Sequence, residues 1–253
     1  MTEDPQTSGA GDTFISHLVE LRSRVVKASA AVIVVFLCMM PWAGRIYDFL
    51  AYPMMVALPA GSKMIATGVI TPFLIPVKVT LLVAFIVALP WVLYQAWAFV
   101  APGLYAHEKK LIAPLVISSS LLFVIGVAFC YFLVFGVVFK FVNDFAPASV
   151  SVAPDIDSYF SFVMTMFIVF GLTFEVPIVV IVLVRMGLVS VEKLKEVRPY
   201  VIVGAFVIAA IVTPPDIMSQ LLLAIPLWVL FEVGLFIAPL FAKVTQAPEE
   251  TAS

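Results

Sequence analysis

Long uninterrupted apolar runs are the feature that most limits how this chain can fold. A helix that crosses a bilayer needs about 20 mostly apolar residues and satisfies its backbone hydrogen bonds internally. Because the runs are continuously apolar rather than alternating, they predict helices and not a transmembrane barrel. We therefore expect an all-α polytopic membrane protein with six transmembrane helices. The six runs, whose ends are approximate, are 25–43, 69–99, 111–138, 157–184, 199–213 and 217–237.

The composition excludes a soluble fold. Hydrophobic residues make up 63% of the 253 residues and charged residues 12%, against about 25% charged in an average soluble domain. The net charge of -2 gives no basic excess for a nucleic-acid partner. Cys38 and Cys130 each lie within an apolar run, which indicates small buried hydrophobes. Without a CxxC motif or a Cys/His cluster, the sequence predicts no metal and no other cofactor.

Lys and Arg placement predicts the orientation in the membrane, because these residues are enriched in cytoplasmic segments. The polar segments form two alternating sets, of which one contains ten Lys and Arg residues and the other three. The richer set consists of 1–27, 100–110, 185–198 and 238–253. The poorer set consists of 44–68, 139–156 and 214–216. We therefore expect both termini in the cytoplasm, on a single membrane domain, 1–253, with flexible polar tails at 1–13 and 244–253.

Two of the runs depart from an ordinary span. Run 199–213 would be about 22 Å long at 1.5 Å per residue, which is shorter than the roughly 30 Å hydrocarbon core. Run 69–99 is too long to stand upright and contains Pro72, Pro76 and Pro90, and proline removes a backbone donor and kinks a helix. Short and kinked helices side by side predict a curved, concave arrangement rather than a compact bundle.

Two polar segments each place one acid among basic residues. Glu20 lies in "FISHLVELRSRVVK" (14–27) and Glu108 in "WAFVAPGLYAHEKK" (97–110). One interpretation is that each acid only neutralises its neighbours, since surface ion pairs contribute little to stability. The other is a receptor for a cationic ligand, because a carboxylate binds a guanidinium through two parallel hydrogen bonds that Lys cannot reproduce.

Glu175 is an acid inside an apolar run. It stands ten residues before Arg185, about 15 Å along a helix, which is near the bilayer midplane, where an ionisable group indicates function. The alternative is a neutral, hydrogen-bonded Glu, because desolvation favours the uncharged form. Lys78 could pair with Glu175, although snorkelling towards the periplasm is the favoured interpretation. Glu232, close to the cytoplasmic end of its run, is also expected to snorkel.

The segment "TPPDIMSQ" (213–220) joins the last two runs. Pro214 and Pro215 fit a sharp reversal, and Asp216 is placed to cap the following helix. Gln220 lies one turn into an apolar helix, where polar side chains hold helices together.

Five stretches make the chain resemble the TatC family, the multispanning receptors of the twin-arginine protein export system. They cover the chain from the first run to the last, and several are long and unusual. The stretches are "HLVELRSR" (17–24), "MIATGVITPFLIPVK" (64–78), "YQAWAFVAPGLYAHEKK" (94–110), "FGLTFEVPI" (170–178) and "TPPDIMSQLLLAIPL" (213–227).

The resemblance implies a function and a set of site residues. It implies a receptor in the bacterial cytoplasmic membrane that binds the twin-arginine signal peptides of folded precursors and uses the proton-motive force. The expected partners are single-span proteins of the TatA and TatB type and further copies of the receptor. By resemblance, Glu175 meets partner helices on the concave face, and Thr213 and Gln220 dock the single-span partners. The residues implied for signal-peptide binding are Glu20, Arg22, Phe99 and Glu108.

The competing classes are a membrane enzyme and a proton-coupled small-solute transporter. A membrane protease needs Ser with His or Lys, or paired aspartates, within the bilayer. His17 and His107 both lie in polar segments, and no pair of aspartates lies within the runs, so we expect no enzyme. A transporter could use Glu175 as its proton relay, but that alternative leaves Glu20 and Glu108 unexplained.

Overall fold

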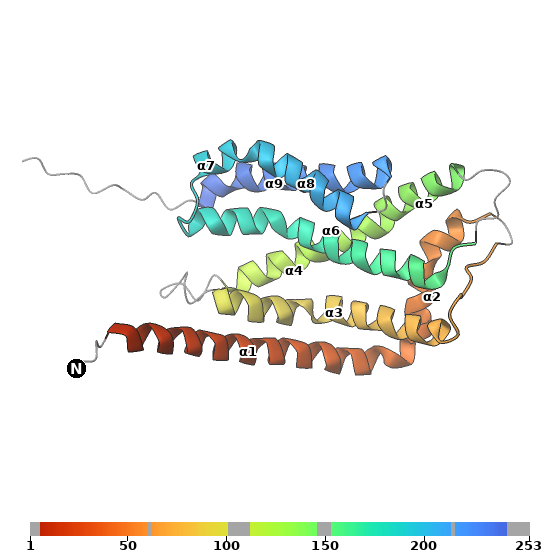
Figure 1. The fold of residues 1–253 in the computed structure, drawn as a ribbon, viewed down its shortest axis with the longest axis horizontal. Helices are drawn as coiled ribbons and strands as arrows, with labels where there is room; N and C mark the ends of the chain where they lie inside the picture. Colours follow the sequence, from red (N-terminus) through yellow and green to blue (C-terminus); the bar gives the residue numbers. More distant parts are fainter. Residues whose placement is uncertain (1–5, 60–61, 101–111, 146–152, 214–215, 242–253) are drawn as a thin grey trace, which may run out of the picture. The chain divides into compact units, whose positions relative to one another are not determined.

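The computed structural model describes residues 6–59, 62–100, 112–145, 153–213 and 216–241. Within these ranges the regular structure is helical, apart from one isolated bridge between Ile65 and Asp155. The chain divides into two compact units. Unit 1 comprises 1–124 and 145–164, and unit 2 comprises 125–144 and 165–253. Helices α4 and α6 therefore each contribute to both units (Figure 1).

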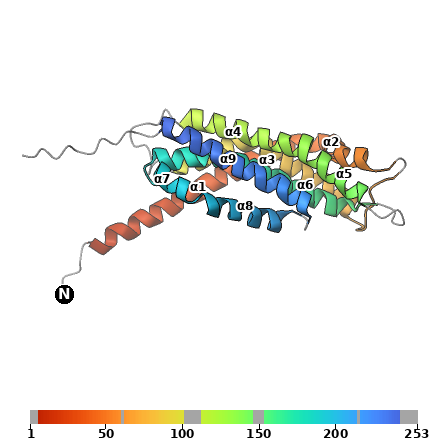
Figure 2. The same cartoon turned by 90° about the horizontal axis from the view of Figure 1, so that it is seen from above.

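Unit 1 is built around the contact between two long helices. Helix α1 lies alongside α3, and α2 also packs against α3 (Figures 1 and 2). A short 3₁₀ segment containing Pro41 separates α1 from α2, because proline cannot donate to the preceding turn. The elements are α1 (Gln6–Met39), η1 (Met40–Trp42), α2 (Ala43–Ala57), α3 (Thr71–Val100), the first part of α4 (Ile112–Phe129) and the first part of α6 (Ile156–Arg185).

A small polar junction joins the α2–α3 connection to the start of α6. The Ile65 amide donates to the Pro154 carbonyl (3.0 Å), and the Ile156 amide donates to the Ile65 carbonyl (2.9 Å). The Asp155 carboxylate accepts from the Thr67 hydroxyl (2.9 Å) and from the Ser158 amide (3.1 Å). Asp155 thus caps the N-terminus of α6 and fastens a loop that is far away in the sequence.

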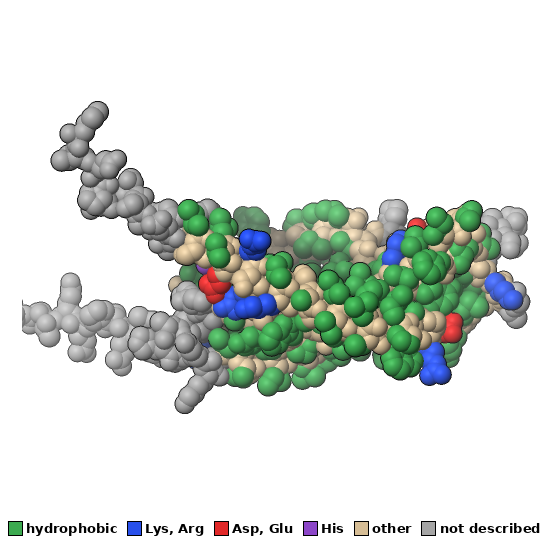
Figure 3. Space-filling model, turned by 90° about the horizontal axis from the view of Figure 1, so that it is seen from below, with side chains coloured by type: hydrophobic (Ala, Val, Ile, Leu, Met, Phe, Trp, Pro, Cys, Tyr) green, Lys and Arg blue, Asp and Glu red, His purple; other side chains and the backbone are tan. Residues whose placement is uncertain are grey.

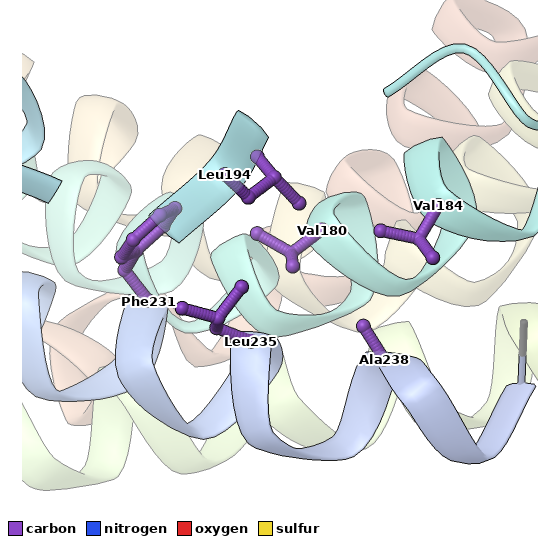
Figure 4. Packing of buried hydrophobic residues seen from close by; sticks show 6 residues of the cluster. All are labelled: Val180, Val184, Leu194, Phe231, Leu235 and Ala238. Carbon is purple, nitrogen blue, oxygen red and sulfur yellow. The ribbon is translucent and has the colours of Figure 1, made fainter. Parts of the chain in front are cut away.

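Unit 2 contains a cluster of six buried apolar residues from α6, α7 and α9 (Figure 4). Its helices include a π-helical turn, η4, between α4 and α5. The cluster consists of Val180, Val184, Leu194, Phe231, Leu235 and Ala238. The elements are the end of α4, η4 (Cys130–Val134), α5 (Phe135–Asp144), the rest of α6, α7 (Val191–Glu196), α8 (Arg198–Val212) and α9 (Ile217–Phe241).

Two glycines let neighbouring helices of unit 2 approach closely. A Cβ at Gly126 would lie 2.6 Å from the Phe170 carbonyl oxygen, and one at Gly234 would lie 2.8 Å from the Pro177 Cα. Only a residue without a side chain allows backbones to come this near, as is common between membrane helices. These contacts fix α4 and α9 against α6.

The surface of the molecule is that of a membrane protein. Hydrophobic side chains cover most of the face in Figure 3, and the charged side chains on it stand near its ends. Leu37 of α1, Ile211 of α8 and Phe236 of α9 are among the many exposed large apolar residues. A soluble monomer does not present so much contiguous apolar surface to water.

The prediction of an all-α membrane protein is confirmed. Apart from residues at their ends, the described parts of all six predicted apolar runs are helical, and among the described residues five helices are long and apolar enough to cross a membrane. The sixth run forms α8, whose 15 residues give about 22 Å. Helix α3 continues through Pro76 and Pro90. The curved arrangement stays a prediction.

Other expectations have mixed outcomes. Helix α1 begins at Gln6, so residues 6–13 of the expected flexible tail are helical, while 244–253 lie outside the described residues. The single membrane domain stays a prediction. Cys130 is buried as expected, but the expectation was wrong for Cys38, which lies on the exposed apolar surface of α1.

Candidate recognition site

Glu20 of α1 is already bound to a guanidinium within its own helix. Arg24, one turn further along, donates to Glu20 Oε1 from Nη2 (2.6 Å) and from Nε (2.9 Å). The side chains are 37% exposed for Glu20 and 23% exposed for Arg24. The contact agrees with the interpretation that Glu20 pairs with a basic neighbour, and the helical spacing of four residues is the cause. The predicted role of Glu20 in signal-peptide binding stays a prediction.

Helix α3 contacts this ion pair through the side chain of Gln95. Gln95 is only 5% exposed, and its Oε1 accepts a long hydrogen bond from Arg24 Nη1 (3.5 Å). Two residues further along, Trp97 Nε1 donates to the fully buried Ser119 Oγ of α4 (3.2 Å). These contacts hold the end of α3 between α1 and α4 of unit 1.

His17 and Phe99 extend the same site by one turn. Their rings are stacked, with centroids 4.3 Å apart and planes inclined by 23°. The structure therefore brings Phe99 and Glu20, both predicted site residues, to the same end of the α1–α3 pair. Arg22 is exposed on α1. Glu108 and His107 lie outside the described residues, so the predicted pairing of the two acids stays a prediction.

Glu175 is buried in α6, at 8% exposure, two residues before the proline inside that helix. Lys78 has a partner that was not predicted from the sequence, because its Nζ lies 3.1 Å from Asp157 Oδ1. Within unit 1, this ion pair links α3 to the first turn of α6. Helical periodicity alone could not indicate it.

The connection between α8 and α9 carries the remaining predicted residues. Asp216 Oδ1 accepts from the Ser219 amide (2.7 Å), so the predicted cap of α9 is confirmed. Thr213 is buried, and its hydroxyl donates to the Ala209 carbonyl (2.8 Å). Gln220 Nε2 donates to the Phe206 carbonyl (3.3 Å) and so links α9 to α8. Pro214 and Pro215 lie outside the described residues.

Glu232 forms an ion pair with a neighbouring helix. Its Oε2 accepts from Arg198 Nη2 at 2.7 Å, which makes an ion pair between α9 and the start of α8. The pair forms because the two helices are antiparallel neighbours, and the expected snorkelling of Glu232 stays a prediction. Within the described ranges, no group of three or more His, Cys, Asp or Glu residues could hold a metal ion.

Comparison with known proteins decides the family. A family model of the Sec-independent protein translocase protein TatC matches residues 16–226. The chain belongs to the TatC family. Among its relatives, TatC of Escherichia coli (strain K12) is 50% identical over 236 residues, covering 93% of this chain and 92% of that protein. TatC of Aquifex aeolicus is 38% identical over 229 residues, covering 90% and 95%.

Solved structures agree with the TatC assignment. A crystal structure of the twin-arginine translocase receptor TatC superposes with a TM-score of 0.79 at 38% identity, covering 89% of this chain and 99% of that one. The chain is therefore a membrane-embedded component of a protein translocase. TatC proteins are receptor components and not enzymes, which also decides against the small-solute transporter.

Proposed function

We propose that this chain is the receptor of a twin-arginine translocase in a bacterial cytoplasmic membrane, with both termini in the cytoplasm. It binds the signal peptides of folded precursors through Glu20 and Glu108, assisted by Arg22 and Phe99. The observation that carries the proposal is the contact between Glu20 and Arg24, in which two guanidinium nitrogens donate to one carboxylate oxygen. This contact supports the proposal because a guanidinium fits against the Glu20 carboxylate there.

The binding energies of the two arginines and of the apolar stretch of the signal indicate which part supplies specificity and which supplies affinity. Hydrogen bonds to charged groups contribute roughly 1.5–3 kcal/mol each, so two arginines supply about 3–6 kcal/mol. Micromolar binding needs about 8 kcal/mol. The apolar stretch of the signal supplies the remainder by burial against the helices, while the carboxylates supply the preference for arginine.

The same proposal assigns partner docking to a second group of polar residues. Single-span partners of the TatA and TatB type, and further copies of this chain, pack near Glu175, Thr213 and Gln220. Burial of Glu175 and Thr213 among apolar helices supports this, because polar side chains within a bilayer hold helices together. The proton-motive force drives the passage of the precursor.

The decisive experiment is direct binding of a signal peptide to the purified protein in nanodiscs. A twin-Arg peptide is compared with its twin-Lys form, on the unchanged protein and on the Glu20→Ala plus Glu108→Ala variant. We expect a strong arginine preference that disappears in the double variant. The matched control is Glu192→Ala plus Glu196→Ala, which removes two exposed acids of α7 on the same expected side. Tight binding that is indifferent to Lys and to the site variant would refute the carboxylate site.

A further inference from the structure

Arg24 has an arrangement that neutralisation alone does not explain. Both of its short hydrogen bonds reach the same oxygen of Glu20, Oε1. Among the described residues, no hydrogen bond reaches the other oxygen, Oε2. Among the described residues, one carboxylate oxygen is therefore occupied and the other accepts no hydrogen bond, on a side chain that is 37% exposed.

Arg24 is itself held from a second helix. An exposed i,i+4 pair on a single helix is worth little and moves freely. Here the Arg24 side chain is only 23% exposed, and its Nη1 contacts the amide oxygen of Gln95 (3.5 Å). Because Gln95 is buried at 5% exposure in α3, it limits the orientations that the Arg24 guanidinium can take. Because Arg24 donates to Glu20, the orientations that the Glu20 carboxylate plane can take are limited as well.

We propose that Arg24 is a positioning residue that gives Glu20 its selectivity for arginine. It fixes the carboxylate plane, leaves Oε2 for the arriving guanidinium, and neutralises much of the Coulomb attraction that any cation would feel. Directional hydrogen bonds then decide what binds. A guanidinium donates them in a rigid planar fork, whereas a Lys ammonium is a compact point charge. This inference rests on the proposed function, because it assumes that Glu20 receives a signal arginine.

The test measures the ratio of twin-Lys to twin-Arg dissociation constants in nanodiscs for four variants. In Arg24→Gln the carboxylate plane is released, and we expect the ratio to fall by about tenfold, the upper value for losing one preorganised side chain. Arg24→Lys keeps the charge but loses the planar fork of donors, and we expect a similar fall in the ratio. Gln95→Leu keeps the packing volume, and we expect the ratio to fall less in this variant. Lys27→Gln removes an exposed charge from the same helix and should leave the ratio unchanged.

The ratio separates positioning from other roles. If Arg24 is merely structural, both peptides weaken equally in Arg24→Gln and the ratio stays constant, which would overturn the inference. Tighter twin-Arg binding in that variant, with the ratio raised, would mean that Arg24 competes with the signal and would also overturn it. Should Arg24→Gln fail to fold, Arg24→Lys and Gln95→Leu give the same comparison. An unchanged protein without arginine preference refutes the proposed function itself, which is a distinct result.

Discussion

Gly126 of α4 and Phe170 of α6 are in backbone contact: a Cβ at position 126 would stand 2.6 Å from the Phe170 carbonyl oxygen. It would also lie 2.9 Å from the ring of Phe174. The backbone oxygen cannot turn away as a flexible side chain could. Within unit 2 the two helices therefore meet at a position where only the hydrogen of a glycine fits, and not a Cβ.

Replacing Gly126 should separate these helices. We expect Gly126→Ala to destabilise the protein by about 1–3 kcal/mol, the usual cost of overpacking a well-packed interior. Gly136 of α5 is the matched control, because nothing lies within 4 Å of its ideal Cβ. Alanine there should stabilise by about 0.5–1 kcal/mol through helix propensity. Thermal unfolding in nanodiscs measures both, and shifts of the same sign would contradict the close contact.

We expect the stabilisation that the Asp155 junction provides to be lost in acid. Hydrogen bonds from the Ser158 amide, and then from the Thr67 hydroxyl, hold the pKa of the Asp155 carboxyl below its usual range. Because the pKa is depressed in the folded state, its contribution to stability is fully present above the unfolded pKa of about 3.9. It is lost as the pH falls through the lower folded value. The difference in Tm between the unchanged protein and Asp155→Asn should therefore be constant from about pH 7 to pH 5 and shrink below about pH 4.

The control for this pH dependence is Asp144→Asn, which alters an exposed carboxyl at the end of α5. Its Tm difference from the unchanged protein should stay small throughout. If Asp155→Asn gave a difference that grew on acidification, the assigned direction would be wrong.

The charge of Glu108 should matter more than its length. We expect Glu108→Gln to weaken twin-Arg peptide binding by about tenfold, since a charge-assisted hydrogen bond becomes an ordinary one. Glu108→Asp keeps the carboxylate and should weaken binding less. Isothermal titration in nanodiscs compares the two. Equal, unchanged affinity in both variants would remove Glu108 from the site.

Glu175 should act after recognition. We predict that Glu175→Ala leaves signal-peptide affinity within about twofold, because the residue is not part of the proposed signal site, yet impairs assembly with single-span partners and transport. Peptide binding, co-purification of the partners and export of a folded precursor are measured on the same variant. Loss of peptide binding with normal assembly would reverse the assignment.

The helices could be predicted from the sequence, whereas their contacts could be predicted only in part. Apolar runs follow from composition, and the Glu20–Arg24 pair follows from a spacing of four. Gln95 is a polar residue in an apolar run, which was a usable signal, but its contact with Arg24 depends on how α1 packs on α3. The π-helical turn at Cys130–Val134 has no sequence signature, because it differs from its flanks only by one extra residue per turn.

The junction at Asp155 also sets the order in which unit 1 can be completed. Thr67 and Asp155 are 88 residues apart, and unit 1 is discontinuous in the sequence. At a synthesis rate of about 5–20 residues per second, Asp155 emerges roughly 4–18 s after Thr67. When that interval begins α1 and α2 are already made, and α3 is made during it, all without the start of α6. Folding of the N-terminal half therefore waits for a segment from the C-terminal half.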